Sequence, residues 1–257
     1  MISFMSLASG SSGNSSLISD GKTNILIDCG VSGANIKAKL NTIGMTPEDI
    51  SAILITHEHS DHTKGVGVMT RRYNIPIYLT EKTLLNMNVG KIDASVINII
   101  SPQKNFRCAD FDIHPFSIPH DAADPVGYSF YTEDGKYTLA TDIGYMPDSL
   151  FHEIMGSKQI ILESNHDLEM LKIGSYPEFL KQRILSQNGH MSNELTASIA
   201  VKLADNGTEG IMLAHLSHDN NTPEIAHITT KNALCTEGYD CVNLCVAARD
   251  SVTRFAV

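Results

Sequence analysis

The chain has 257 residues, enough to bury a sizeable core as one large α/β domain or as two small ones. Its formal net charge of −10 argues against binding nucleic acid through a broad basic surface, but bound divalent ions would supply local positive charge to a nuclease. The five cysteines include no C-x-x-C pair and indicate reduced thiols. With no signal-peptide pattern and no stretch as long as a membrane span, we expect a cytoplasmic protein without a membrane partner.

Short strands and small-residue turns are predicted for the beginning of the chain. Three apolar stretches have strand character: residues 2–8, 15–19 and 24–27. The loop Gly10-Ser11-Ser12-Gly13-Asn14 would let the backbone approach a ligand closely, although a plain turn is the simpler interpretation. Asp28 follows the third strand, where it can either cap the next turn or hold a nearby histidine.

A compact group of metal-binding side chains follows the apolar run Ile53-Leu54-Ile55. It comprises His57, His59, Asp61 and His62. Zinc and similar metals take imidazole nitrogen and carboxylate oxygen, so this loop offers up to four ligands. In an extended segment His57 and His59 point the same way, while Asp61 and His62 can face a second ion. The spacing predicts a two-metal centre, and the alternative is a histidine-rich surface turn.

Strands and helices alternate through the rest of the chain. We expect helices near residues 63–73, 81–87, 147–155 and 223–235. A further helix is expected through Ile36, Leu40 and Ile43, ending at Gly44. Another is expected after an N-cap at Ser192, with Leu195, Ile199 and Leu203 as its apolar stripe. We expect strands near residues 75–79, 95–100, 106–120, 127–132, 136–141, 159–162, 211–214 and 241–248. Three polar residues lie at strand ends: His120, Asp142 and His215. Taken alone, His120 is more typical of a structural histidine, whereas Asp142 fits a helix or turn cap as well as it fits a metal ligand. His218, beyond the last of these strand ends, is a weaker candidate than His215.

The segment from Thr56 to His62 resembles the signature of the metallo-β-lactamase superfamily, whose members mostly hydrolyse esters, thioesters, lactams or phosphodiesters. The resemblance implies an α/β protein of the α+β type with a four-layer αββα sandwich. It also implies a ligand set, in which His57, His59 and His120 hold one metal ion, Asp61, His62 and His215 hold a second, and Asp142 bridges them. Asp28 matches a residue that holds the metal loop without binding metal.

Further segments resemble the YycJ/WalJ-type metallohydrolases, which are bacterial DNA exonucleases acting from 5′ ends and distantly similar to RNase J and RNase Z. These segments are Ser6–Ser15, Glu163–Asp167, Gly174–Pro177, Gly189–Asn193 and His215–Ser217. The interval from Asp142 to His215 is too short for a separate β-CASP cap domain. We therefore expect a single domain over residues 1–257 without such a cap.

The resemblance implies a binuclear metal-dependent phosphodiesterase, in particular a DNA 5′-to-3′ exonuclease in which a bridging hydroxide attacks phosphorus. Asp61, Asp142 and His190 are the expected catalytic residues. Zinc, manganese or iron would suit the ligands. The substrate is a nucleic acid, with DNA favoured over RNA, and because no residue pattern reads a base edge we expect little sequence preference.

Substrate contacts are predicted in the second half of the chain. His190, Ser192 and Asn193 are candidates for phosphate contact, His190 also for protonation of the leaving group, and Asn165 and His166 for the pocket wall. A helix cap with a packed polar loop is an equally simple interpretation. Two rival functions are a small-molecule thioesterase or lactonase, which the acidic composition favours, and a non-catalytic metal-bound binding module.

Overall fold

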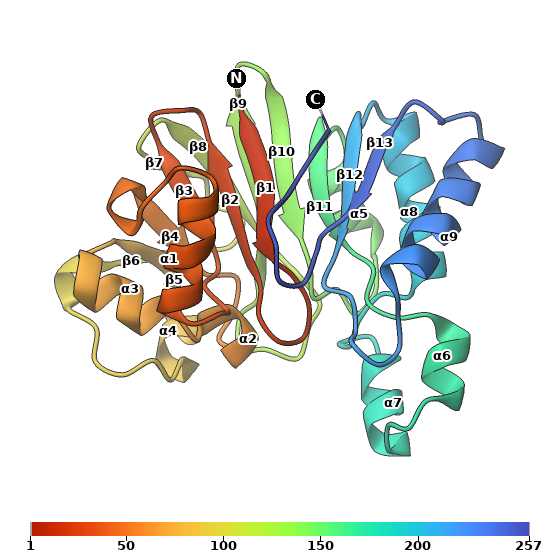
Figure 1. Ribbon diagram of the computed structural model, residues 1–257, viewed down its shortest axis with the longest axis horizontal. Helices are drawn as coiled ribbons and strands as arrows, with labels where there is room; N and C mark the ends of the chain where they lie inside the picture. Colours follow the sequence, from red (N-terminus) through yellow and green to blue (C-terminus); the bar gives the residue numbers. More distant parts are fainter. Residues whose placement is uncertain (1, 257) are drawn as a thin grey trace. The chain divides into compact units, whose positions relative to one another are not determined.

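The computed structural model describes residues 2–256, and the chain divides into two compact units (Figure 1). Unit 1 comprises Met1–Ser117, Ala122–Asp134 and Ala248–Arg254, and unit 2 comprises Ile118–Asp121, Gly135–Ala247 and Phe255–Val257. A single domain over residues 1–257 without a β-CASP cap stays a prediction, and residues 1 and 257 lie outside the described residues.

Unit 1 contains a seven-stranded mixed sheet with the order β14-β1-β2-β3-β4-β5-β6. Its strands are β1 (Ser3–Ala8), β2 (Ser15–Ser19), β3 (Asn24–Ile27), β4 (Ala52–Leu54), β5 (Ile77–Thr80), β6 (Ile97–Ile100) and β14 (Thr253–Arg254). The strands from β14 to β3 are antiparallel, and those from β3 to β6 are parallel. Strands β2, β3 and β4 are buried along their whole length, and apolar residues make up all of β4 and three of the four residues of β3.

Helices cover the apolar core of unit 1, where α1 (Gly33–Thr42) lies beside α3 (Val66–Tyr73) (Figure 1). The others are α2 (Ser60–Thr63), α4 (Glu81–Asn86) and the 3₁₀ turns Pro47–Asp49 and Ala94–Val96. The helix expected over residues 63–73 is interrupted between α2 and α3. There the Gly65 N–H donates to the Cys29 carbonyl at 2.7 Å, and a Cβ at Gly65 would lie 2.4 Å from the Val31 carbonyl oxygen.

Unit 1 also contains three antiparallel strands that support the histidine loop. They are β7 (Phe106–Cys108), β8 (Phe111–Ser117) and β9 (Val126–Thr132). The Val126 N–H donates to the Thr56 carbonyl at 3.0 Å, and the Tyr128 hydroxyl donates to the Ile55 carbonyl at 2.7 Å. Because Tyr128 is fully buried, this hydrogen bond fixes the main chain just before His57.

Unit 2 contains four parallel strands in the order β13-β12-β11-β10. They are β10 (Gly135–Ala140), β11 (Gln159–Glu163), β12 (Gly210–Ala214) and β13 (Asn243–Val246). Its helices are α5 (Asp148–Ile154), α6 (Leu168–Ile173), α7 (Glu178–Ile184), α8 (Asn193–Asp205) and α9 (Pro223–Thr236). Parallel strands bring their carboxyl ends to one edge, and the polar residues after β10, β11 and β12 meet there. Across residues 2–256, we find no helix with both the length and the apolar character to cross a membrane.

Candidate metal centre

The histidine loop of unit 1 forms what we call the first cluster, which comprises Asn14, Asp28, His57, His59, Asp61 and His62. The loop leaves β4 in an extended conformation and turns at α2, which begins at Ser60. Nε2 of His57 lies 3.1 Å from Nδ1 of His59, as the alternation of side chains predicts, and Oδ2 of Asp61 lies 3.5 Å from Nε2 of His62. His57 and His62 are buried.

Asp28 holds this loop through contacts with both of its carboxylate oxygens. Oδ1 accepts the Thr56 N–H at 2.9 Å, and Oδ2 lies 2.7 Å from Nδ1 of His62 and 2.8 Å from the Thr56 hydroxyl. Burial raises the pKa of Asp28, although His62 acts in the opposite direction. A histidine that is held through Nδ1 can present Nε2 to a metal ion. The contact between Asp28 and Nδ1 of His62 is therefore the one expected of a residue that orients a metal-binding imidazole.

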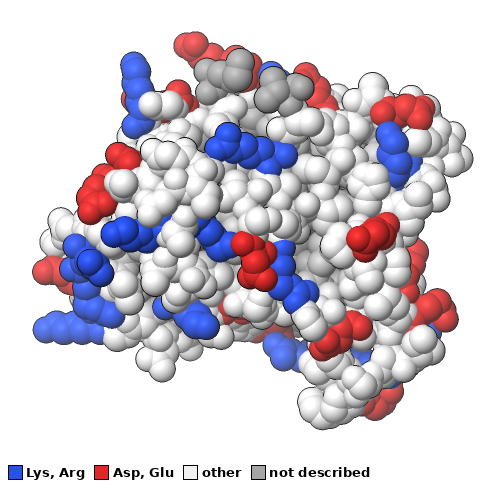
Figure 2. Space-filling view, viewed as in Figure 1, with Lys and Arg blue, Asp and Glu red and all other residues white. Residues whose placement is uncertain are grey.

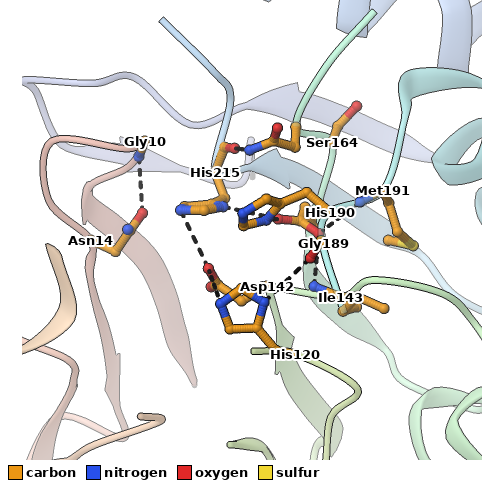
Figure 3. Close-up of polar contacts among 12 residues, drawn as sticks. Gly10, Asn14, His120, Asp142, Ile143, Ser164, Gly189, His190, Met191 and His215 are labelled. Carbon is orange, nitrogen blue, oxygen red and sulfur yellow. Dashed lines mark hydrogen bonds and ion pairs between the residues drawn. The ribbon is translucent and has the colours of Figure 1, made fainter. Parts of the chain in front are cut away.

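Asn14 is a member of the first cluster that the sequence did not single out. Its Nδ2 lies 3.3 Å from Oδ2 of Asp61 and 3.2 Å from Nε2 of His62. Its Oδ1 accepts the Gly10 N–H at 2.9 Å, which closes the small-residue loop on itself (Figure 3). The loop is therefore more than a plain turn, because it places the Asn14 amide against Asp61 and His62, two candidate metal ligands.

The second cluster lies in unit 2 and comprises His120, Asp142, Glu163, His190 and His215 (Figure 3). Asp142 is its centre, because its Oδ1 lies 3.5 Å from Nε2 of His215 and 3.9 Å from Nε2 of His120. All three side chains are buried. Nδ1 of His120 lies 3.3 Å from the Gly189 carbonyl. Burial is the largest influence on His120 and lowers its pKa, which favours the neutral imidazole that binds metals.

Glu163 connects two histidines of the second cluster. Its Oε1 lies 2.8 Å from Nδ1 of His190 and 2.9 Å from Nδ1 of His215, while Oε2 accepts the N–H groups of Ile143 and Met191 at 2.8 and 3.0 Å. Complete burial by itself would raise the pKa of Glu163, but the contacts with both histidines outweigh it and lower the pKa to about 2. Glu163 is thus an ionised carboxylate that holds two histidines. Its position at the end of an apolar strand did not reveal this role.

Three residues of the two clusters have left-handed backbone conformations within two residues of a strand end. The φ angles are 61° at Asp28, 62° at Asp142 and 58° at His215. Side chains other than glycine rarely adopt such angles, and the cost is of order 1–3 kcal/mol each. The surrounding hydrogen bonds hold these turns in place, and backbone strain of this kind concentrates at functional sites.

The residues that are predicted to contact the substrate differ in how deeply they are buried. Asn165 is buried and donates to the His215 carbonyl at 2.9 Å. His166 is 1% exposed, neither of its ring nitrogens has a hydrogen-bond partner within residues 2–256, and burial lowers its pKa to about 4. The Ser192 hydroxyl caps α8 by accepting the Leu195 N–H at 3.3 Å, as expected from the capping interpretation. The Asn193 side chain is fully buried, whereas that of His190 is 20% exposed.

His218, the weaker candidate of the last strand end, is separate from the second cluster. Its side chain is 67% exposed, and its Nδ1 lies 2.6 Å from Oδ1 of Asp219. His215, in contrast, is 3% exposed and contacts both Asp142 and Glu163. The two histidines therefore differ in burial and in partners, and His215 as the metal ligand stays a prediction.

The donor set of both clusters suits divalent metal ions. Within the second cluster, Asp142, Glu163, His190 and His215 each offer a nitrogen or oxygen atom, and these atoms lie within 4.8 Å of one another. Imidazole nitrogen and carboxylate oxygen are ligands for zinc, manganese and iron. Buried carboxylates orient His62 and His215, which is the usual support of a metal-binding histidine.

Comparisons with known proteins agree with this chemistry. A family model described as the beta-lactamase superfamily domain matches residues 23–216. The chain is 44% identical over 232 residues to the exodeoxyribonuclease WalJ of Streptococcus pneumoniae, which covers 89% of this chain and 86% of the relative. It is 40% identical over 240 residues to the exodeoxyribonuclease YycJ of Bacillus anthracis, covering 92% of this chain and 90% of the relative.

Solved structures show similarity of fold. The metallo-β-lactamase fold protein YhfI of Bacillus subtilis superposes with a TM-score of 0.77 at 18% identity, covering 98% of this chain and 99% of the other. The short form of human tRNase Z superposes with a TM-score of 0.65 at 15% identity and covers both chains completely, at 100% each. These similarities confirm the α/β sandwich that the sequence predicted.

Proposed function

Because the chain belongs to the β-lactamase superfamily, we propose that it is a metal-dependent phosphodiesterase, and specifically a DNA exonuclease that acts from 5′ ends in the cytoplasm. The observation that carries the proposal is the identity of 40–44% over most of the chain to relatives named exodeoxyribonucleases. The two clusters support it, since each pairs histidines with a buried carboxylate in the manner of a metal site.

For the metal ligands we propose the set that the sequence resemblance implies. His57, His59 and His120 would hold one ion, Asp61, His62 and His215 a second, and Asp142 both. The donor types fit zinc or manganese, with iron as a third choice. Divalent ions at these residues would lower the pKa of water and neutralise the charge that develops on the phosphoryl oxygens.

Residues that do not bind metal have positioning roles in this proposal. Asp28 directs Nε2 of His62, and Glu163 directs Nε2 of His215, through the Nδ1 contacts of each imidazole. His190 is held by the same Glu163 oxygen and is partly exposed, which supports a role for its Nε2 in donating a proton to the leaving oxygen of a phosphodiester. His166 and Asn165 would form the neighbouring wall.

The surface charge favours recognition through the phosphate at the site and not through a broad basic face. On the face drawn in Figure 2, the described lysine and arginine side chains are interspersed with aspartate and glutamate. The chain as a whole carries a net charge of −10. Contacts to phosphate position a nucleic acid without reading its sequence, so we propose little sequence preference.

A panel of substrates tests this function against the small-molecule alternative. The purified protein is incubated with manganese or zinc and either DNA oligonucleotides, RNA oligonucleotides, a thioester or a lactone, beside an Asp142→Ala variant. The proposal predicts that DNA is hydrolysed, that RNA is hydrolysed more slowly, and that the variant is inactive. Efficient hydrolysis of the thioester or lactone without cleavage of DNA would contradict the assignment of DNA as the substrate. Only the membership of the β-lactamase superfamily would then stand.

A further inference from the structure

The loop that follows His215 carries a buried amide, Asn221, which contacts the segment that directly follows Glu163. Asn221 is 5% exposed, and its Nδ2 lies 2.9 Å from the Ser164 carbonyl and 3.1 Å from the Asn165 carbonyl. These two carbonyls belong to the segment directly after β11, where regular strand pairing has ended. Asn221 therefore provides the hydrogen bonds that this irregular segment needs in the protein interior.

Asn193 and Asn221 form a reciprocal pair of side-chain amides. Nδ2 of Asn193 donates to Oδ1 of Asn221 at 2.9 Å, and Nδ2 of Asn221 donates to Oδ1 of Asn193 at the same distance. The Ser164 hydroxyl also donates to Oδ1 of Asn193, at 2.7 Å. Since Asn193 is fully buried, its amide contacts these protein groups and not the solvent.

The amide pair joins the three segments that carry Glu163, His190 and His215. Ser164 directly follows Glu163, and Asn193 lies three residues after His190 at the start of α8. The third segment is fixed at both ends, because Asn165 Nδ2 donates to the His215 carbonyl at 2.9 Å while Asn221 closes the loop. A displacement at the amide pair would therefore move both imidazoles relative to the carboxylate between them.

We propose that Asn193 and Asn221 are positioning residues, which act by holding His190 and His215 on the shared oxygen of Glu163. This inference rests on the proposed function for the roles of His190 and His215 in the reaction. The hydrogen bonds of Asn193 and Asn221 do not depend on it. It replaces the phosphate-contact role that the sequence suggested for Asn193. Buried polar networks specify one arrangement when every member is satisfied, and loss of one member leaves several groups without partners.

The test compares Asn221→Ala with a matched control, Asn24→Ala. Asn24 is also a buried amide, 8% exposed, with Nδ2 bonded to the Asp49 carbonyl at 2.9 Å, but it is the first residue of β3 and has no hydrogen bond to a residue of either cluster among those described. Three quantities are measured: the melting temperature, the ¹⁵N chemical shifts of the His190 and His215 rings in metal-free protein, and the Kd for manganese by calorimetry.

We expect both variants to melt at a lower temperature, and only Asn221→Ala to shift the ring nitrogens of His190 and His215. We expect the same variant to bind manganese about 10–100-fold more weakly, the usual effect of losing a partner that orients a metal ligand. If Asn221→Ala does not fold, Asn193→Ser, which keeps a hydroxyl at this place, provides the same comparison.

Ring-nitrogen shifts and a manganese Kd that match the wild type within twofold, in a variant that melts like Asn24→Ala, would show that the amide pair only stabilises the fold. The chemical shifts do not depend on any substrate. Failure to cleave DNA would therefore count against the proposed function, and unchanged shifts would count against the positioning role.

Discussion

Oε1 of Glu163 lies 2.9 Å from Nδ1 of His215, although the two residues are 52 positions apart in the sequence. The parallel pairing of β11 with β12 creates this contact, because it sets Glu163 in register with Ala214, the residue before His215. The carboxylate at the end of one strand thus orients the imidazole at the end of the next. Both side chains are buried, so water does not compete for the contact.

Replacing Glu163 by glutamine should weaken metal binding and catalysis and also lower the melting temperature, because the amide nitrogen cannot accept the hydrogen bonds that a carboxylate oxygen accepts. Glutamine keeps the shape but loses the charge that stabilises both imidazoles, so we expect manganese affinity and kcat to fall about 10–100-fold. Calorimetry and initial rates on DNA measure the two effects. Glu178→Gln, on the first turn of α7, is the control and should behave as wild type. Full activity of Glu163→Gln would contradict the orienting role.

Asp28→Asn tests the equivalent support in the first cluster. The amide can still accept the Thr56 N–H, but it no longer provides a charged partner for Nδ1 of His62. We expect about a tenfold or greater loss of bound metal, measured as metal content per chain after dialysis against a fixed free concentration. A variant that retains the metal content of the wild type would show that Asp28 only caps the turn after β3.

His190→Ala should affect substrates according to their leaving group. If His190 protonates the leaving oxygen, its removal should lower kcat on DNA by about 10²–10⁴-fold. The loss should be much smaller on a nitrophenyl phosphodiester, because nitrophenolate leaves without protonation. Rates on the two substrates are compared under the same metal conditions. An equal loss on both would assign His190 to binding or to metal support.

His166 predicts a pH dependence of stability on the acid side. Burial lowers its pKa to about 4, whereas the unfolded chain titrates near the ordinary value of about 6.5. The unfolded state therefore binds the proton more readily, and the stability due to neutral His166 is present above about pH 6.5 and is lost as the pH falls towards 4. Between pH 7.5 and 5 the loss should be about 2 kcal/mol.

Urea unfolding at the two pH values measures this loss in the wild type and in His166→Gln, which removes the titrating group. Histidines that do not interact with His166 contribute equally to both proteins, so the difference reports His166 together with its coupling to neighbouring charges. Within the folded protein, Glu163 opposes the shift of the His166 pKa and His190 reinforces it. Identical pH dependences in the two proteins would mean that His166 is solvated and titrates normally.

Local patterns predicted the elements of the first sheet closely. Strands β2 and β3 have the bounds that alternation and turn residues indicated, Ser15–Ser19 and Asn24–Ile27. The turn between them is determined locally, because Oδ1 of Asp20 accepts the N–H groups of Lys22 and Thr23 at 2.8 and 2.7 Å. The break of the helix at Gly65 was missed because its cause, the Cys29 carbonyl, lies 36 residues earlier in the chain, as the residue numbers show.

The difference between local patterns and contacts distant in sequence also explains which site residues could be predicted. His57, His59, Asp61 and His62 are close in sequence, so their spacing alone indicated a metal loop. The segment Glu163–Asp167 was singled out by its resemblance, but no role was assigned to Glu163 itself, which ends an apolar strand and, as a fully buried carboxylate, requires partners.

The amides of Asn14 and Asn221 were also missed. Asn14 contacts His62, 48 positions away, and Asn221 contacts Asn193, 28 positions away. Such contacts depend on the folded arrangement of the segments and leave no local pattern in the sequence.

End-labelled DNA provides the most direct measurement of the central claim, that this chain is a metal-dependent exonuclease acting from 5′ ends. Duplex and single-stranded DNA labelled at either the 5′ or the 3′ end are digested with manganese, beside Asp142→Ala as the control. We expect immediate release of labelled mononucleotide from the 5′ label, stepwise shortening of the 3′-labelled strand, and no reaction in the control. Release from the 3′ label first, internal cuts, or equal activity of Asp142→Ala would contradict it.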